Sequence, residues 1–382
     1  MIIFYLIFVL YVYNTFLSIF AFIKKEEKRK ITNKEEQSFT ILVPCHNEEE
    51  VIFDTLHSLN QSQYKNIFIY VIADNCSDNT VSEINRFKKT YKTKNVEVIE
   101  VKGGSKPKAI SLAVEYLKEN NKWVNDNISI IDADNRISPS LYTEFNKQHK
   151  LGYKILQAKI VSHNDTNFIA KGFTSSFNTM TEAFQYARNV IGLSASLSGT
   201  GFSIDRFVWD DVGFENCESL TEDLEFSVLS ILKGYKIRFI MSEYVLNQNL
   251  EEFIPSLVQR LRWARGYMQV SVRLSFTLVR AFVRRPSLQI FDTFVFINTP
   301  PRILIYAVSN FYFLVNDNYI PRWAILILLV YNTFFIIYAN GYKIKYIIPH
   351  IFFAICTSFV IIYAVFTYKN TKWKKTKHKK ID

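Results

Sequence analysis

The sequence predicts an α/β fold, a sheet-forming domain that carries membrane helices at both ends. Between residues 39 and 150, short apolar runs of strand length alternate with helical patterns, which is typical of a sheet covered by helices. Residues 2–23 contain no charged side chain, and the C-terminal part of the chain holds further long apolar segments. Runs of about 20 apolar residues are long enough to cross a bilayer.

Residues 1–24 are expected to form an N-terminal transmembrane anchor. No basic segment precedes the apolar run and no small-x-small cleavage site follows it, which favours an uncleaved anchor over a removable signal peptide. A basic and polar linker, residues 25–38, comes next, and the positive-inside rule keeps such a flank in the cytoplasm. The following domain is therefore expected in a reducing compartment, where its four cysteines form no disulfide and no zinc site.

The α/β domain is expected over residues 39–250. Strands are predicted at residues 39–43, 67–73, 96–101 and 128–131, and helices from near Glu49 and over residues 107–119. The first strand is expected to end at Pro44, the second at Asp74 and the fourth at Asp132. Because open α/β sheets bind ligands at the carboxyl ends of their strands, these positions are candidate site residues.

The rest of the chain is expected to associate with the membrane. Residues 251–287 mix leucines with arginines, which predicts an amphipathic helix at the interface. Residues 288–367 form a C-terminal membrane region with apolar segments at 288–315, 323–340 and 346–366. The lysine-rich tail, residues 368–382, should stay cytoplasmic, so an even number of crossings must separate it from the α/β domain. Asp292, Arg302 and Pro300-Pro301 mark the first segment as interfacial or re-entrant, which leaves three spans in total.

The net charge of +11 does not indicate a nucleic-acid partner. Much of the basic excess lies beside apolar segments, in residues 24–30, in the arginines of residues 260–285 and in the C-terminal tail. Attraction to the anionic lipids of the inner leaflet explains this placement. Membrane lipids are therefore the expected partner of these charges.

Asp132-Ala133-Asp134 is the strongest local motif. Two carboxylates spaced i, i+2 at the end of an apolar strand can hold Mg²⁺ or Mn²⁺ while the metal holds a diphosphate. The same residues fit a solvated turn in which Asn135 and Ser138 supply the turn chemistry. Taken by itself, the motif leaves both interpretations open.

Each of four other motifs, taken alone, also fits an ordinary structural role. Residues 74–78 fit ligand binding by Asp74 together with capping, by Asp78, of a helix that begins near Thr80. Residues 103–108 offer flexible backbone and two cations at a helix start, which fits a phosphate contact or a surface turn. Residues 221–223 fit an N-cap followed by acidic residues, and residues 259–263 fit an interface anchor.

The order and separation of these motifs resemble the processive family 2 glycosyltransferases, such as the bacterial cellulose, chitin and hyaluronan synthases and poly-N-acetylglucosamine synthase. Their pattern is Asp, Asp-x-Asp, then Asp followed after 35 residues by Gln-x-x-Arg-Trp. Here Asp74 and Asp132-Ala133-Asp134 match its first parts, and 35 residues separate Asp223 from Gln259. Residues 43–48 resemble the family's nucleotide-binding strand, and Gly199-Thr200-Gly201-Phe202 resembles its acceptor-side loop.

This resemblance implies a fold and a set of residue roles. The fold is a GT-A-type, Rossmann-like domain, and Asp223 is the expected catalytic base. Asp132 and Asp134 are the expected ligands of Mg²⁺ or Mn²⁺. Asp74 is expected at the nucleotide base, Lys106 and Arg262 at the diphosphate and Trp263 beside the acceptor sugar. The expected substrate-binding residues are Pro44, Asn47, Glu48, Asp74, Lys106, Asp132, Gly201, Glu222, Gln259, Arg262 and Trp263.

The implied function is inverting transfer of a sugar from a nucleotide-diphospho-sugar, with a UDP-sugar as the expected donor, to a growing β-linked polysaccharide at the cytoplasmic face of the plasma membrane. Three spans make a thin wall for a polymer channel, so a small membrane partner subunit or self-association is expected. Two alternatives remain open at this point. One is single addition to a lipid or lipid-linked acceptor, and the other is a non-catalytic membrane subunit of a glycan assembly complex.

Overall fold

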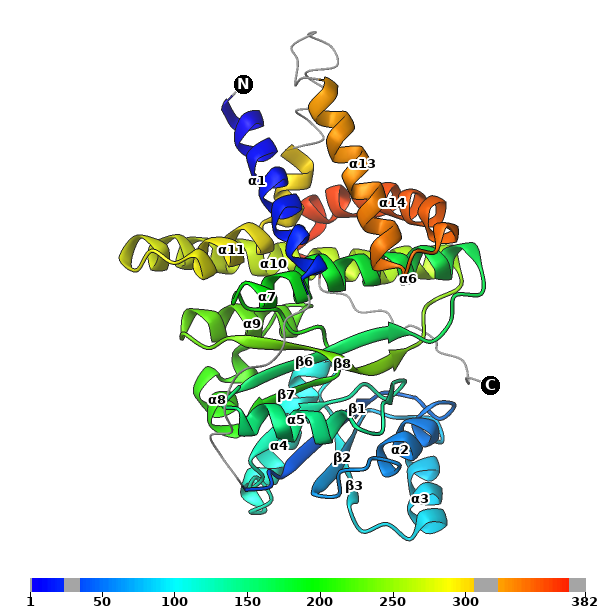
Figure 1. The fold of residues 1–382 in the computed structure, drawn as a ribbon. Helices are drawn as coiled ribbons and strands as arrows, with labels where there is room; N and C mark the ends of the chain where they lie inside the picture. The colour runs from blue at the N-terminus through cyan, green and yellow to red at the C-terminus, as the bar shows by residue number, and fades with distance from the viewer. Residues whose placement is uncertain (1, 24–34, 306–321, 371–382) are drawn as a thin grey trace.

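The computed structural model describes residues 2–23, 35–305 and 322–370. A sheet with its covering helices fills the lower half of the molecule, and a group of mostly long helices lies above it (Figure 1). The upper helices are α1 (Ile2–Ser18), α6 (Phe168–Met180), α7 (Ala187–Val190), α10 (Phe253–Arg284), α11 (Leu288–Ile297), α13 (Arg322–Ala339) and α14 (Ile347–Thr367).

The sheet has eight strands in the order β3-β2-β1-β4-β7-β6-β8-β5. The four strands β1 to β4 run parallel to one another, whereas β7 is antiparallel to both β4 and β6, so the sheet is mixed. The strands are β1 (Phe39–Cys45), β2 (Ile67–Asp74), β3 (Val96–Val101), β4 (Asn127–Ile130), β5 (Arg136–Ile137), β6 (Ile155–Ser162), β7 (Phe202–Asp205) and β8 (Ile237–Asn247). The predicted α/β class and its four predicted strands are confirmed.

Alternate side chains of the central strands face two separate cores. Ile41 and Val43 of β1 pack on one face of the sheet, whereas Leu42 between them packs on the other. Both faces are covered, which explains why these strands are apolar throughout rather than alternating. The first core includes α2 (Ile52–Asn60), α3 (Thr80–Tyr91) and α5 (Leu141–Lys150), and the second includes α4 (Lys106–Glu119), α8 (Arg206–Val212) and α9 (Glu222–Leu232).

The first strand does not end at Pro44, as the sequence predicts, but continues to Cys45. The pairing of β1 with β2 includes Pro44, opposite Ile72, whereas its pairing with β4 stops at Leu42. Beyond Leu42 the strand therefore has a neighbouring strand on one side only. A proline, which has no N–H to donate, is tolerated in a strand at such a position.

The predicted amphipathic segment is confirmed as a helix, since α10 is one continuous helix of 32 residues. It packs against α14, α11 and α9, and its side chains Arg260 and Trp263 contact Phe173 of α6. Arg260, which was expected among the interface arginines, is instead buried on this inner face. Its guanidinium carbon lies 3.7 Å from the ring centre of Phe353, and its Nη1 donates to Thr357 Oγ1. An aromatic face attracts a cation that has been withdrawn from water.

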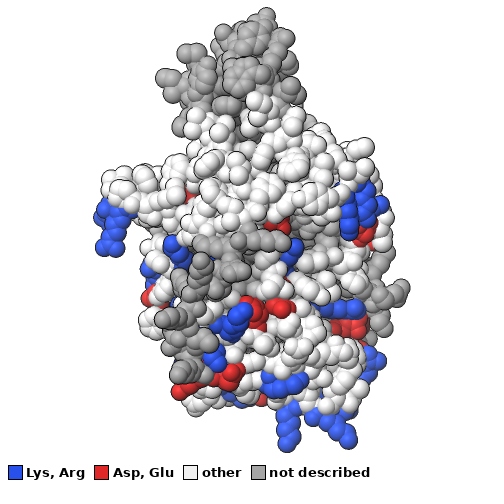
Figure 2. All heavy atoms as spheres, viewed as in Figure 1, with Lys and Arg blue, Asp and Glu red and all other residues white. Residues whose placement is uncertain are grey.

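Within the described ranges, one helix, Ile344–Thr367, is long and apolar enough to cross a membrane. Shorter apolar helices span Val12–Phe22, Leu288–Ile297 and Ile327–Ala339. The upper part of the face seen in Figure 2 carries few charged side chains, whereas they are frequent over the sheet domain. Three predicted pieces lie outside the described residues: most of the linker, residues 306–315 of the first C-terminal segment, and residues 371–382 of the tail.

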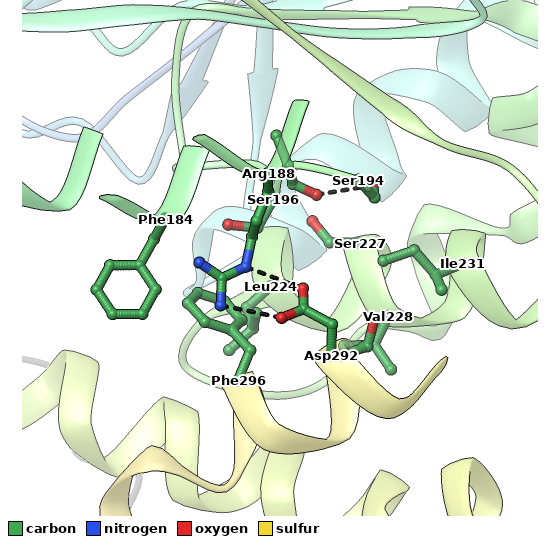
Figure 3. Close-up of a pocket in the computed structure, with 12 residues that line it drawn as sticks. Phe184, Arg188, Ser194, Ser196, Leu224, Ser227, Val228, Ile231, Asp292 and Phe296 are labelled. Carbon is green, nitrogen blue, oxygen red and sulfur yellow. Dashed lines mark hydrogen bonds and ion pairs between the residues drawn. The ribbon is translucent and has the colours of Figure 1, made fainter. Parts of the chain in front are cut away.

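Asp292, one of the charges that mark the first C-terminal segment, is paired inside the protein. Its carboxylate accepts hydrogen bonds from Arg188 of α7, with Nε 2.9 Å from Oδ2, and both side chains are only 3% exposed (Figure 3). Tyr13 donates to the same carboxylate, and Arg188 also donates to Asn14. Removing either partner of a buried ion pair leaves an uncompensated charge and destabilises the protein. The contacts of Asp292 and Arg188 therefore hold α1, α7 and α11 together.

A cavity of about 20 Å³ adjoins this ion pair, between α7, α9 and α11. Its lining is largely apolar, with Ser194, Ser196 and Ser227 among the few polar groups. The volume suits a single water molecule, not a sugar. The functional site has to be sought at the edge of the sheet.

Candidate active site

Asp132 and Asp134 lie at the carboxyl edge of the sheet, directly after β4. Both are partly exposed on either side of the buried Ala133. A turn is present, since the Asn135 N–H donates to the Asp132 carbonyl oxygen at 3.0 Å, but the two residues expected to supply its chemistry are not solvated, because Asn135 is fully buried and Ser138 nearly so. The Asn135 amide donates to Asp134 Oδ1 at 3.0 Å and to Asn247 Oδ1 at 3.1 Å. The carboxylate of Asp134 is therefore oriented by a buried amide.

Lys106, the first residue of α4, carries a cation into this group of carboxylates. Its Nζ lies 2.6 Å from Asp132 Oδ1, 2.8 Å from the Gly199 carbonyl oxygen and 3.8 Å from Glu222 Oε1. Burial alone lowers the pKa of a lysine, but the charges of Asp132 and Glu222 outweigh it and raise the pKa of Lys106 above its usual value. The ammonium stays charged and connects the end of β4, the loop before β7 and the start of α9.

Asp74, at the end of β2, organises the glycine loop that leads to Lys106. Its carboxylate accepts the backbone N–H of Gly103 at 2.7 Å and that of Gly104 at 3.0 Å. Gly103 has no room for a side chain, since a Cβ there would lie 2.7 Å from the Ala109 nitrogen, and Gly104 has a φ of 78°. The two glycine N–H groups are thus used within the protein, and Lys106, which follows them, carries the cation of this loop that reaches Asp132.

Asn47 and Glu48 join the loops that follow β1 and β2. Asn47 has a φ of 59°, and its side-chain oxygen accepts the Ser77 N–H at 2.7 Å. The backbone N–H of Glu48 donates to Thr80 Oγ1 at 2.8 Å. The predicted nucleotide end of the site, with Pro44 and Asp74, is therefore one connected group. The predicted start of α3 at Thr80 is confirmed, and Asp78 accepts the Thr80 N–H as expected.

Asp223 lies in the first turn of α9, beside Glu222. Burial, and after it the like charge of Glu222, raises the pKa of Asp223 to about 7. The charge of Lys106 acts in the opposite direction and lowers this pKa. Its Oδ2 would lie 3.6 Å from a Cβ on Gly199, so the turn Gly199-Thr200-Gly201 passes close by. Gly201, with a φ of 67°, itself packs against Val245, leaving no room for a side chain. A carboxylate with a pKa near 7 is suited to accept a proton at neutral pH.

Thr221 occupies the N-cap position of α9, but its side chain makes no capping hydrogen bond. Its Oγ1 is buried without a hydrogen-bond partner. Gly266 of α10 lies against this residue, since a Cβ there would lie 2.6 Å from Thr221 Cγ2 and 2.8 Å from the Thr221 nitrogen. The backbone of α10 therefore packs directly onto the start of the helix that carries Asp223.

Gln259, Arg262 and Trp263 lie on the same helix as Gly266. Residues three, four and seven positions apart share a helix face, so Gln259 and Arg262 lie on the face of α10 that carries Gly266. All three side chains of the motif are partly exposed. The Trp263 ring contacts Phe173 and Phe177 of α6 edge-on, with ring centres 6.0 Å apart in each case. The described contacts of Trp263 are thus with α6, whereas the described close contact between α10 and the start of α9 is made by Gly266.

Three residues of α10 that no sequence motif indicated, Gly266, Gln269 and Arg273, contact the start of α9 or its flanks. Besides Gly266, Gln269 accepts the Leu220 N–H at 2.9 Å and donates to the Tyr368 carbonyl at 2.7 Å. Arg273 forms an ion pair of 2.6 Å with the buried Glu225. Two features of the sequence could have indicated this contact. The three residues have the i, i+3, i+7 spacing of one helix face after the Gln-x-x-Arg-Trp motif, and one of them is a glycine inside a helical pattern.

The carboxylates fit a divalent metal that a bound ligand completes. No group of three or more His, Cys, Asp or Glu able to hold a metal occurs in the part of the chain that the structure describes. Mg²⁺ in nucleotide sites commonly uses one or two carboxylates together with substrate phosphates and water. Asp132 and Asp134 offer such oxygens, and both are partly open to solvent. Mn²⁺ accepts the same oxygen ligands.

Comparisons with known proteins identify the class. The family described as "Glycosyl transferase family group 2" matches residues 127–339, and "Glycosyl transferase family 2" matches residues 40–213. The chain therefore belongs to glycosyltransferase family 2. A mannosyltransferase from Pyrobaculum calidifontis, solved in complex with GDP-Man and Mn²⁺, has a TM-score of 0.64 at 14% identity and covers 94% of this chain and 95% of its own. The fold is thus an α/β GT-A-like fold with a mixed sheet.

Two curated relatives are similar in sequence. A probable glycosyltransferase of Bacillus subtilis, YdaM, is 28% identical over 276 residues, which cover 70% of this chain and 63% of the relative. A poly-beta-1,6-N-acetyl-D-glucosamine synthase of Staphylococcus epidermidis is 28% identical over 246 residues, which cover 64% of this chain and 58% of the relative. The chain thus matches about six tenths of the length of these relatives.

Replacing Gly266 by alanine tests the packing of α10 on α9. A methyl group there must displace Thr221 or move the helix, and such overpacking costs about 1–3 kcal/mol. We expect a lower Tm in a thermal unfolding measurement on the full chain in detergent, and slower sugar transfer because Asp223 shifts with α9. Thr221→Ser in the same background removes the nearest methyl and should restore part of both losses. Val272→Ala, on the exposed side of α10, is the control, and a Gly266→Ala protein with unchanged Tm and activity would contradict the packing argument.

Proposed function

We propose that the chain is an inverting glycosyltransferase that moves a sugar from a nucleotide-diphospho-sugar to a growing β-linked polysaccharide at the cytoplasmic face of the plasma membrane. The observation that carries this proposal is the position of Lys106, 2.6 Å from Asp132 and 3.8 Å from Glu222, with the charge of Asp223 also acting on it. A cation among carboxylates at the carboxyl edge of the sheet suits a diphosphate and a divalent metal. Membership of family 2 supports the same activity.

In this proposal the donor lies along the edge formed by β1, β2 and β4. Pro44, Asn47, Glu48 and Asp74 form the nucleotide end, and Asp132 and Asp134 hold Mg²⁺ or Mn²⁺. When bound, the metal supplies positive charge that stabilises the leaving diphosphate. Lys106 adds a second cation: its ammonium has three rotatable donors and can turn from Asp132 to a phosphate oxygen. Arg262 is the proposed further contact for the diphosphate, and a UDP-sugar is the proposed donor.

Asp223 is the proposed catalytic base. A pKa of about 7 leaves a large fraction of the side chain ionised at neutral pH and still basic enough to take a proton. It accepts the proton of an acceptor hydroxyl as that oxygen attacks the anomeric carbon, and the bond to the diphosphate breaks on the opposite side. Such an in-line displacement inverts the anomeric centre, so an α-linked donor gives a β-linked product.

The acceptor is proposed to bind on the side of Gly201, Glu222, Gln259 and Trp263. Similarity to a synthase named for a β-linked polymer supports a polysaccharide acceptor. We propose three membrane spans in total, with α10 at the interface, and a small partner subunit or self-association to complete a path for the polymer. The shortage of long apolar helices within the described ranges favours the second candidate, single addition to a lipid or lipid-linked acceptor.

Asp223→Asn tests the proposed function. Loss of the general base should lower nucleoside diphosphate release by about 10²–10⁴-fold, since this is the usual contribution of a positioned base. Donor binding should persist, because Asp223 is not among the proposed donor contacts. The assay uses membranes with a panel of labelled nucleotide-sugars and Mn²⁺, and product size separates polymer from single addition. Asp211→Asn, at an exposed carboxylate, is the matched control, and unchanged release by Asp223→Asn would overturn the assignment.

The pH profile of transfer follows from the same carboxylate. Below its pKa of about 7 Asp223 is protonated and cannot accept a proton, so kcat/KM should rise about tenfold per pH unit towards pH 7 and level off above it. Glu222→Gln removes the like charge that contributes to the raised pKa, and the midpoint should move to lower pH. Initial rates between pH 5 and 8.5 measure both. A profile that is flat over this range would mean that no group with a raised pKa acts as the base.

A further inference from the structure

Asn135 is a fully buried amide that lies between Asp134, a proposed metal ligand, and Asn247, the last residue of β8. Its Nδ2 donates to Asp134 Oδ1 at 3.0 Å and to Asn247 Oδ1 at 3.1 Å. An ionised carboxylate only accepts hydrogen bonds, so the nitrogen of the Asn135 amide, and not its oxygen, has to face Asp134. The second hydrogen of that nitrogen then requires an acceptor, which Asn247 supplies. The two amides thus form a chain whose direction is set by the Asp134 carboxylate.

The register of the sheet brings the two amides together. β5 (Arg136–Ile137) pairs antiparallel with Leu246 and Val245 of β8. The next pair in the same register is Asn135 with Asn247. On its other side, β8 pairs with β6 as far as Asn247. The acceptor for the Asn135 amide therefore lies on a strand that has neighbours on both sides.

The side-chain oxygen of Asn135 has no comparable use. It is buried and has no hydrogen-bond partner within the described residues. A buried acceptor without a partner destabilises a fold, and an apolar side chain of similar size avoids this penalty. Packing therefore does not account for an asparagine at this position. What an apolar side chain cannot supply is the N–H group that holds Asp134.

We propose that Asn135 and Asn247 are positioning residues for the divalent metal. Asn247 orients the Asn135 amide, and that amide fixes the direction of the Asp134 carboxylate. This inference rests on the proposed function, in which Asp134 is a metal ligand. Mg²⁺ demands a near-ideal arrangement of its oxygen ligands, so a carboxylate that is free to rotate holds it less well. Losing a group that orients a metal ligand typically lowers metal affinity by about 10–100-fold.

The Mn²⁺ dependence of nucleotide binding tests the role of Asn135. UDP, with GDP as a second probe, is titrated into the full chain in detergent at a series of Mn²⁺ concentrations and in EDTA. In Asn135→Leu, the Mn²⁺ concentration that gives half of the gain in UDP affinity should rise by about 10–100-fold, with unchanged UDP binding in EDTA. The Tm should stay the same or rise, because the unpaired oxygen is removed together with the N–H groups. Asn125→Leu removes a buried amide that donates to Thr40 just before β4, and as the matched control it should keep the wild-type Mn²⁺ dependence.

Variants of Asn247 test whether the two amides act as one chain. Asn247→Leu removes the acceptor at a partly exposed position and should raise the required Mn²⁺ concentration, as Asn135→Leu does. Asn247→Asp keeps an acceptor there and should need no more Mn²⁺ than the wild type. The double variant Asn135→Leu/Asn247→Leu should lose no more than Asn135→Leu alone, since both residues act through the same hydrogen bonds.

Three results would count against the inference. A wild-type Mn²⁺ dependence in Asn135→Leu or in Asn247→Leu would overturn it. A loss of UDP binding in EDTA as large as the loss with Mn²⁺ would also overturn it, because that result indicates a packing role. Wild-type protein that binds both nucleotides equally well with Mn²⁺ and in EDTA would show that the proposed metal site is absent, which overturns that part of the proposed function and this inference with it.

Discussion

The ion pair between Lys106 and Asp132 is the interaction on which the rest of the site depends. The fold gathers Asp132, Asp134, Glu222 and Asp223 at one edge of the sheet, and like charges at such short range repel. The Lys106 ammonium, 2.6 Å from Asp132 and 3.8 Å from Glu222, is the counter-charge that lets β4 and α9 approach each other. Its charge also lowers the pKa of Asp223, which burial and the like charge of Glu222 raise to about 7. The same residue thus offsets the repulsion among the carboxylates and affects the titration of Asp223.

The second constraint is the close packing of α10 on the start of α9. Gly266 allows the two backbones to meet at Thr221, and Gln269 links Leu220 with Tyr368 at the end of α14. The helix that carries Asp223 is therefore connected to the end of α14 through one turn of α10.

Much of the sheet and of the carboxylate set follows from the sequence, because buried parallel strands are continuous apolar runs that end in polar residues. Ile67–Asp74 and Asn127–Ile130 are such runs, and Asp74 and Asp132 were found at their ends. What the sequence could not supply is pairing between distant segments. The strand extends through Pro44 because β4 ends early, Asn135 is buried because Asn247 reaches it, and Arg260 is buried because Phe353 covers it. Each of these outcomes depends on a partner more than 80 positions away in the chain. Asp292 likewise has a charged partner, Arg188, that no local pattern indicates.

The metal dependence of nucleotide binding tests whether the carboxyl edge of the sheet binds a nucleoside diphosphate together with a divalent metal. Isothermal titration of the full chain with UDP, with GDP for comparison, is performed in the presence of Mn²⁺ and in the presence of EDTA. Because Asp134 is a proposed metal ligand, we expect Mn²⁺ to tighten binding at least about tenfold in the wild type and Asp134→Asn to lose this gain. Equal affinity with and without Mn²⁺ in the wild type, or a full gain retained in Asp134→Asn, would contradict this expectation.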